Sequence, residues 1–197
     1  MKLLTYIGCL GVLLIGLSCN TNQKKETQPL DLKTDSVALS SSAATDTEAN
    51  EITVTLTAKN ESDVRGTIHF KEVNGTVQFT ANVQGLTPGE HAIHIHEKGD
   101  CSSADATSTG GHWNPTNQPH GKWGDEAGFH LGDIGNLTAD QNGNATLTLA
   151  TDMWCIGCDD TDKSILNRAI IIHQGVDDFS SQPSGNAGKR IACAVIK

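Results

Sequence analysis

The chain has 197 residues, a formal net charge of -9 at pH 7 and 4% aromatic residues. This length suits one ordinary domain with an additional segment. The acidic balance disfavours nucleic-acid binding, since neutralising phosphates needs a basic surface.

The first residues predict export. A basic start at Lys2 is followed by an apolar run over residues 3–17, which is typical of a bacterial secretory signal peptide and too short for a confident membrane-spanning helix. The sequence Gly16-Leu17-Ser18-Cys19 resembles a lipobox, so we expect a lipoprotein-type signal over residues 1–18 and lipidation of Cys19. Ordinary cleavage and release is the alternative. The expected location is the periplasm or cell envelope, with the chain lipid-anchored to a membrane.

Residues 19–50 are rich in Thr, Ser, Asp and Ala and contain no aromatic residue, which predicts a disordered tether. From residue 51 the sequence consists of short runs in which apolar and polar residues alternate. These runs predict eight strands, near 52–57, 64–71, 77–83, 91–97, 131–138, 144–150, 168–173 and 191–196. The fold class is therefore all-β, a mainly antiparallel sandwich or closed barrel.

Two stretches break the even spacing of the strands, residues 98–129 and 174–190. Long irregular loops in a compact β domain usually carry function. Asn74-Gly75 stands between the second and third runs and predicts a tight hairpin.

Six of the eight histidines form one pattern with an aspartate. Two of them alternate along the fourth strand, so they share a face of the sheet. An imidazole-rich set with one carboxylate and no thiolate suits zinc or copper, and seven groups are too many for one tetrahedral ion. We expect two metal ions that share a bridging ligand. The seven residues are His94, His96, His112, His120, His130, His173 and Asp133.

The two remaining histidines have simpler interpretations. His91 falls on the core face with Ile93 and Ile95, which predicts a buried, hydrogen-bonded structural histidine. His69 alternates with polar residues and is expected to be a solvated surface side chain.

Four segments resemble the copper/zinc superoxide dismutase family, in the family's order. They are residues 89–101, with His94-Ile95-His96, and residues 111–115, 128–133 and 185–193. The resemblance covers nearly all of residues 51–197, which we take as the enzyme domain. The loop between Cys101 and His130 resembles the eukaryotic type more than the usual periplasmic bacterial type.

The resemblance implies one copper and one zinc ion per subunit in an eight-stranded Greek-key barrel. The implied copper ligands are His94, His96, His112 and His173. The implied zinc ligands are His112, His120, His130 and Asp133, with His112 shared. The implied reaction is dismutation of superoxide to oxygen and hydrogen peroxide by a redox-cycling copper, with zinc in a structural role.

The resemblance also implies roles for three residues outside the ligand set. His112 would exchange the proton, Arg190 would hold the anionic substrate beside copper, and Asp177 would accept hydrogen bonds from one histidine of each metal site. An acidic chain must attract an anion locally, by copper, Arg190 and, as further candidates, Lys189 or Lys122.

Six cysteines are present. The resemblance implies a disulfide between Cys101 and Cys193. The Cys155-x-x-Cys158 pair has no counterpart that the resemblance leads us to expect. A local disulfide is the first interpretation in an oxidising compartment, and a soft-metal half-site, a redox pair or an intermolecular bridge are the others.

One competing function remains, a non-catalytic carrier or store of copper and zinc built on the same barrel. Such a carrier would need an exposed motif through which it passes the metal on, and Cys155 and Cys158 are the candidates. The substrate partner implied by the resemblance is superoxide. Subunit number stays open between a monomer and a homodimer.

Overall fold

The computed structural model describes residues 49–197. The expected signal peptide, Cys19 and the tether up to residue 48 lie outside the described residues. Eight strands and one short 3-10 helix, η1, make up the described part. Their bounds are β1 Asn50–Ala58, β2 Arg65–Val73, β3 Thr76–Gln84, β4 Gly89–His96, η1 Thr107–Thr109, β5 Asp133–Ala139, β6 Ala145–Thr151, β7 Ala169–His173 and β8 Arg190–Val195.

The strands form a nearly closed antiparallel barrel in the order β5-β4-β7-β8-β1-β2-β3-β6. The pairings of β4 with β7 and of β3 with β6 join strands that are not consecutive, which is the crossing pattern of a Greek key. The predicted all-β fold class is confirmed, and all eight strands overlap the ranges expected from the sequence. Within residues 49–197 no helix is long and apolar enough to span a membrane.

Alternation explains the first half of the barrel. In β1, Val54 and Leu56 are buried while the threonines that alternate with them, Thr53, Thr55 and Thr57, are exposed. Asn74 and Gly75 both have positive φ, 52° and 75°, and the strands pair directly on either side at Val73 and Thr76. Such a turn matches the twist of the strands it joins, as the hairpin prediction required.

The core is closed by an aromatic group that also supports the longest loop. Phe70 and Phe79 lie 5.3 Å apart between ring centroids, and Trp154 meets them edge-on at 6.4 and 6.1 Å. Trp154 is 1% exposed and its indole N–H donates to Leu131 O at 2.9 Å. Trp123 packs 5.2 Å from Trp154, so the loop that precedes β5 is anchored on the core.

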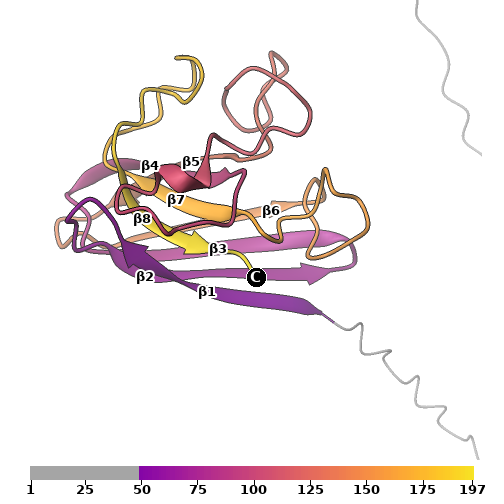
Figure 1. Ribbon diagram of the computed structural model, residues 1–197, viewed down its shortest axis with the longest axis horizontal. Helices are drawn as coiled ribbons and strands as arrows, with labels where there is room; N and C mark the ends of the chain where they lie inside the picture. The colour runs from indigo at the N-terminus through magenta and orange to yellow at the C-terminus, as the bar shows by residue number, and fades with distance from the viewer. Residues whose placement is uncertain (1–48) are drawn as a thin grey trace, which may run out of the picture. The chain divides into compact units, whose positions relative to one another are not determined.

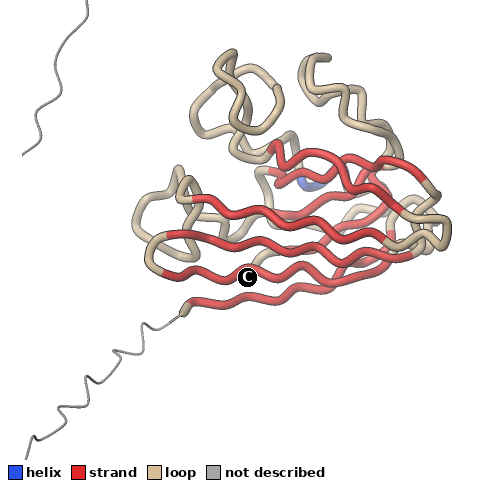
Figure 2. The backbone as a smooth tube through the Cα atoms, turned by 180° about the vertical axis from the view of Figure 1, so that it is seen from behind, coloured by secondary structure: helices blue, strands red, loops and turns tan. Residues whose placement is uncertain are grey.

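The two long loops leave the same side of the barrel. Figures 1 and 2 show the loop before β5 and the loop between β7 and β8 rising together above β4 and β5. A hydrogen bond from His120 N to Gln182 Oε1 at 2.9 Å joins them. The histidine-bearing end of β4 lies beneath this pair of loops.

Candidate metal centre

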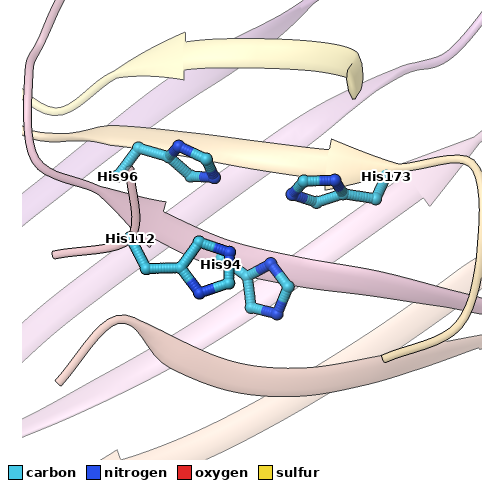
Figure 3. Close-up of side chains that lie close together, drawn as sticks. All are labelled: His94, His96, His112 and His173. Carbon is cyan, nitrogen blue, oxygen red and sulfur yellow. The ribbon is translucent and has the colours of Figure 1, made fainter. Parts of the chain in front are cut away.

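Three segments bring four histidines to one place. His94 and His96 end β4, His173 ends the neighbouring β7, and His112 in the long loop is bridged to His96 by backbone pairing. Figure 3 shows the four rings pointing toward a common space. One potential ligand atom from each lies within 4.8 Å of the others.

The nitrogens that face this space have no hydrogen-bond partner within the described residues. They are His94 Nδ1, His96 Nε2, His112 Nε2 and His173 Nε2, all of them buried. Leaving one such group unsatisfied costs about 1–3 kcal/mol. Four converging lone pairs are the donor set of a metal ion, so the residues fit one here.

The opposite nitrogen of three of these rings is occupied, and this sets which nitrogen is free. The pairs are His94 Nε2 with Asp177 Oδ2 at 2.8 Å, His96 Nδ1 with Gly110 O at 3.0 Å, and His173 Nδ1 with Gly188 O at 3.2 Å. Because each acceptor takes the ring proton, the other nitrogen presents its lone pair to the shared space.

A second group lies on the other side of His112. It consists of His112, His120, His130 and Asp133, again with ligand atoms within 4.8 Å of one another. Asp133 Oδ1 lies 2.8 Å from His112 Nδ1 and 3.2 Å from His130 Nδ1, and Oδ2 lies 3.0 Å from His120 Nδ1. His112 faces one group through Nε2 and the other through Nδ1, the arrangement of a bridging imidazole.

Asp177 connects the two groups from behind. Its carboxylate meets His94 Nε2 and His120 Nε2, each at 2.8 Å, and all three side chains are fully buried. Asn136 holds the backbone of Asp177 through two hydrogen bonds of 2.8 and 3.0 Å. Gly185, at φ 63°, lies against this contact, and a β-carbon there would overlap Asp177 Oδ1 and approach His120 Nε2 within 2.6 Å.

Burial keeps the first group of imidazoles neutral. It lowers the pKa of His96 and of His173 well below the ordinary value, with the neighbouring histidines and Arg190 adding to the effect. Burial also lowers the pKa of His112 to about 4, although Asp133 opposes it. Neutral imidazole is the form that binds a metal, so these rings need lose no proton at neutral pH.

The second group is acidic at its centre. Burial opposes charge at His120, but Asp133 and Asp177 outweigh it and raise the His120 pKa to about 9. Burial also opposes the charge of Asp133 and so raises its pKa. Hydrogen bonds with three histidines outweigh this effect and place the Asp133 pKa far below the usual range. A metal ion bound here must displace the proton of His120, so its binding depends on pH.

A cavity of about 340 Å³ opens onto the first group, and its lining includes His96, His112, His173, Pro183, Ser184 and Arg190. Arg190 is the cationic side chain of this lining. Lys189, a further candidate for attracting an anion, lines a neighbouring hollow with Glu61 and Asp105.

Arg190 is oriented by contacts that sequence reasoning missed. Its Nη1 donates to Ala106 O at 2.8 Å and to Thr109 Oγ1 at 2.9 Å. The carbonyls of Gly110 and Gly188 were missed as well. Backbone acceptors leave no mark on residue type, so the signal available was the length and position of the two loops.

Both cysteine pairs are disulfides. Cys101 joins Cys193 and ties the long loop to β8, and Cys155 joins Cys158 within the loop before β7, each with Cα atoms 5.9 Å apart. His91 belongs to neither ligand group, and its ring contacts His173 O at 3.1 Å and Thr87 O at 2.9 Å. It is the buried structural histidine that the strand pattern indicated.

Comparisons with known proteins agree on one family. The model of the family described as "Copper/zinc superoxide dismutase (SODC)" matches residues 64–196. Superoxide dismutase (Cu-Zn) 3 of Arabidopsis thaliana is 36% identical over 143 residues, covering 69% of this chain and 84% of the relative. Superoxide dismutase (Cu-Zn) 2 of Aquifex aeolicus is 39% identical over 142 residues, covering 70% and 81%.

An extracellular superoxide dismutase (Cu-Zn) of Caenorhabditis elegans is 33% identical over 141 residues, covering 68% of this chain and 62% of the relative. Among solved structures, the clock protein EA4 has a TM-score of 0.65 at 37% identity, covering 74% of this chain and 92% of that one. A double mutant of a SOD-like protein from Bacillus subtilis has a TM-score of 0.64 at 34% identity, covering 72% and 94%.

Proposed function

The chain belongs to the copper/zinc superoxide dismutase family, and on that premise we propose how its residues divide the work of two metal ions. The activity of the family is the dismutation of superoxide to oxygen and hydrogen peroxide, and this chain is such an enzyme, with copper and zinc as its cofactors. We assign copper to His94, His96, His112 and His173, and zinc to His112, His120, His130 and Asp133.

The observation that carries the assignment is the set of buried, unpartnered ring nitrogens on the copper side of His112. Their other nitrogens are held by acceptors, so the set is oriented before any ion binds. When bound, copper supplies the one-electron redox chemistry, whereas zinc has no redox chemistry of its own. The residues must therefore provide substrate binding, proton transfer and orientation.

Arg190 is suited to the binding of an anion. Its guanidinium stays charged at any physiological pH and lines the same cavity as His96 and His173. A superoxide ion in this cavity of about 340 Å³ would lie between the guanidinium and the free nitrogens. The acidic net charge of the chain makes this local attraction necessary.

His112 is suited to proton transfer at Nε2. That nitrogen is buried, has no partner among the described residues and faces the cavity, while Nδ1 points to Asp133 at 2.8 Å. In our proposal Nε2 takes up a proton from solvent in one half-reaction and gives it to the product in the other, where a second proton from water completes hydrogen peroxide. Asp133 and the proposed zinc site hold the ring from Nδ1, so that Nε2 stays directed toward the cavity.

The shared histidine can be tested with one spectroscopic experiment. The full chain is loaded with copper and with cobalt in place of zinc. If His112 bridges the sites, the two paramagnetic ions couple and the copper EPR signal is lost, and it returns when zinc replaces cobalt. A copper signal that is unchanged beside bound cobalt would contradict the bridge.

A carrier or store of copper and zinc is the competing function, and it is not favoured. It gives no reason for a guanidinium in the cavity that opens onto the free nitrogens. Its candidate delivery motif is closed as a disulfide between Cys155 and Cys158.

We propose that the chain is exported, lipidated at Cys19 and held to a membrane by residues 19–50, with residues 51–197 as the enzyme domain. Two disulfides and a relative named as extracellular support export. Mass spectrometry of the purified envelope protein tests lipidation. An N-terminal peptide that begins at Cys19 with added acyl mass is expected, and an unmodified Cys19 would overturn that part.

A homodimer remains a proposal to test by light scattering.

A further inference from the structure

The loop between β4 and His112 is held in place beside the cavity by hydrogen bonds and a disulfide. Lys59 Nζ donates to the carbonyls of Cys101 and Ser103, and Asn60 N donates to Ala104 O at 3.1 Å. With the disulfide to Cys193, these contacts fasten the loop to β8 and to the residues that directly follow β1. The helical turn η1, over Thr107–Thr109, is therefore held in a defined place.

Thr109 is the residue of this turn that reaches the site. It is fully buried, and its hydroxyl lies 2.8 Å from Ala106 O, 2.9 Å from Arg190 Nη1 and 3.3 Å from His96 Nδ1. A hydroxyl has one proton and two lone pairs. It can thus donate to Ala106 O, accept from Arg190 and face the ring of His96 at the same time.

The acceptors of Arg190 are neutral. Within residues 49–197 no carboxylate lies within ion-pair distance of the guanidinium, whose side-chain hydrogen bonds go to Ala106 O and Thr109 Oγ1. A carboxylate at that place would orient the group and cancel its charge. A carbonyl and a hydroxyl orient it and leave the charge available to an anion.

We propose that Thr109 is a positioning residue for the reaction, whose hydroxyl aims the Arg190 guanidinium into the cavity while contacting the ring of His96. The inference rests on the proposed function, because it needs Arg190 to bind superoxide. A purely local role for the hydroxyl is the alternative, since it also bonds across the turn to Ala106. The backbone already closes that turn through Thr109 N and Ala106 O at 3.2 Å.

The test compares Thr109→Val, which keeps the shape and removes the hydroxyl, with Thr109→Ser, which keeps the hydroxyl. Thr107→Val is the matched control, because it lies in the same turn and its hydroxyl bonds to Asp105 instead, at 2.7 Å. The full chain is loaded with copper and zinc, metals are counted, and kcat/KM for superoxide is measured together with azide affinity at the copper.

We expect Thr109→Val to lower kcat/KM about fivefold to tenfold and to weaken azide binding similarly, the scale of losing one ordinary hydrogen bond while Ala106 O still holds the guanidinium. Thr109→Ser and Thr107→Val should stay within about twofold of the parent chain. Equal rates and azide affinities for Thr109→Val and the parent would overturn the proposal. If the valine variant fails to hold both metals, the Thr109→Ser and Thr109→Ala pair, which differ by one hydroxyl, carries the same comparison.

A double-mutant cycle separates this inference from its premise. If Thr109 acts through Arg190, adding Thr109→Val to Arg190→Ala changes the rate little further, whereas a separate structural effect would add in full and overturn the proposal. If Arg190→Ala alone leaves the rate unchanged, the role proposed for Arg190 fails and takes this inference with it. A slow Arg190→Ala beside a normal Thr109→Val overturns the inference alone.

Discussion

Asp177 Oδ2 lies 2.8 Å from His94 Nε2, and both side chains are fully buried. The other carboxylate oxygen makes an equal contact with His120 Nε2. One side chain thus orients a histidine of each proposed metal site. Any change at Asp177 should be felt at both metals, although Asp177 belongs to neither ligand group.

Replacing Asp177 with Asn tests this link. An amide has a single acceptor oxygen, so it can serve one histidine and turns its N–H groups toward the other. We expect zinc affinity to fall about 10–100-fold, with a shifted copper spectrum. The neighbouring Asp178→Asn is the control, because Asp178 is exposed and bonds to Ser180 and Ser181. Unchanged zinc affinity and copper spectrum in Asp177→Asn would contradict the bridging role.

Two buried histidines of β4 should behave differently when replaced. His96→Gln removes a free nitrogen of the proposed copper group, so we expect loss of copper and of activity with zinc retained. His91→Gln removes a ring that is hydrogen-bonded at both nitrogens and faces no metal group. We expect it to keep copper while the free energy of unfolding falls about 1–3 kcal/mol. Metal counting and urea unfolding decide, and retained copper in His96→Gln would remove His96 from the ligand set.

The metal-free chain should lose stability as the pH falls below about 6.5. Burial lowers the pKa values of His94, His96 and His173, and that of His112 to about 4, so the unfolded chain binds more protons in this range. Stability therefore rises with pH across it, by up to about 1.4 kcal/mol per pH unit for each group.

The contribution of His120 to stability depends on pH in the opposite direction. Two carboxylates outweigh its burial and raise its pKa to about 9, so its contribution is complete below about 6.5 and is lost as the pH rises through 9. The metal-free chain should thus be most stable near neutral pH. Urea midpoints of chelator-treated protein at pH 5, 7 and 9.5 check this, and equal midpoints at pH 5 and 7 would contradict it.

The two disulfides should differ in their effect on stability and activity. The chain-entropy relation assigns about 2 kcal/mol to closing the short loop between Cys155 and Cys158, and about 4–5 kcal/mol to the Cys101–Cys193 link with its separation of 92 residues. We expect Cys155→Ser/Cys158→Ser to lose some stability and keep its rate.

Cys101→Ser/Cys193→Ser should lose more stability and also lower the rate, because the freed loop carries the acceptors of Arg190. Unfolding free energies and superoxide decay, measured on metal-counted protein, compare the two pairs. Equal activity in both double variants would show that the loop needs no covalent fastening to hold Arg190.

Much of the fold could be predicted because its strands alternate. The threonines of β1 face outward around Val54 and Leu56, so their pattern shows directly in the residue order. β4 and β7 are buried along nearly their whole length and do not alternate in this way. Their partnership comes from the crossover, which no local pattern encodes.

The metal groups could be predicted from residue type, since six histidines and an aspartate at strand ends and in one long loop are chemically specific. The groups that aim them could not. Gly110 and Gly188 act through their carbonyls, and Thr109 acts through a hydroxyl like those of many surface threonines. Such contacts depend on how two loops of the chain are laid over β4, which only the three-dimensional structure reveals.

We expect this chain to dismutate superoxide with Arg190 beside a copper held by four histidines. Superoxide decay after pulse radiolysis tests it most directly, on the full chain carrying one copper and one zinc, over a range of ionic strength. We expect fast catalytic decay that slows with added salt, and a large fall in rate with a weaker salt dependence in Arg190→Ala. Full metal occupancy without catalytic decay would show that the chain is not a superoxide dismutase.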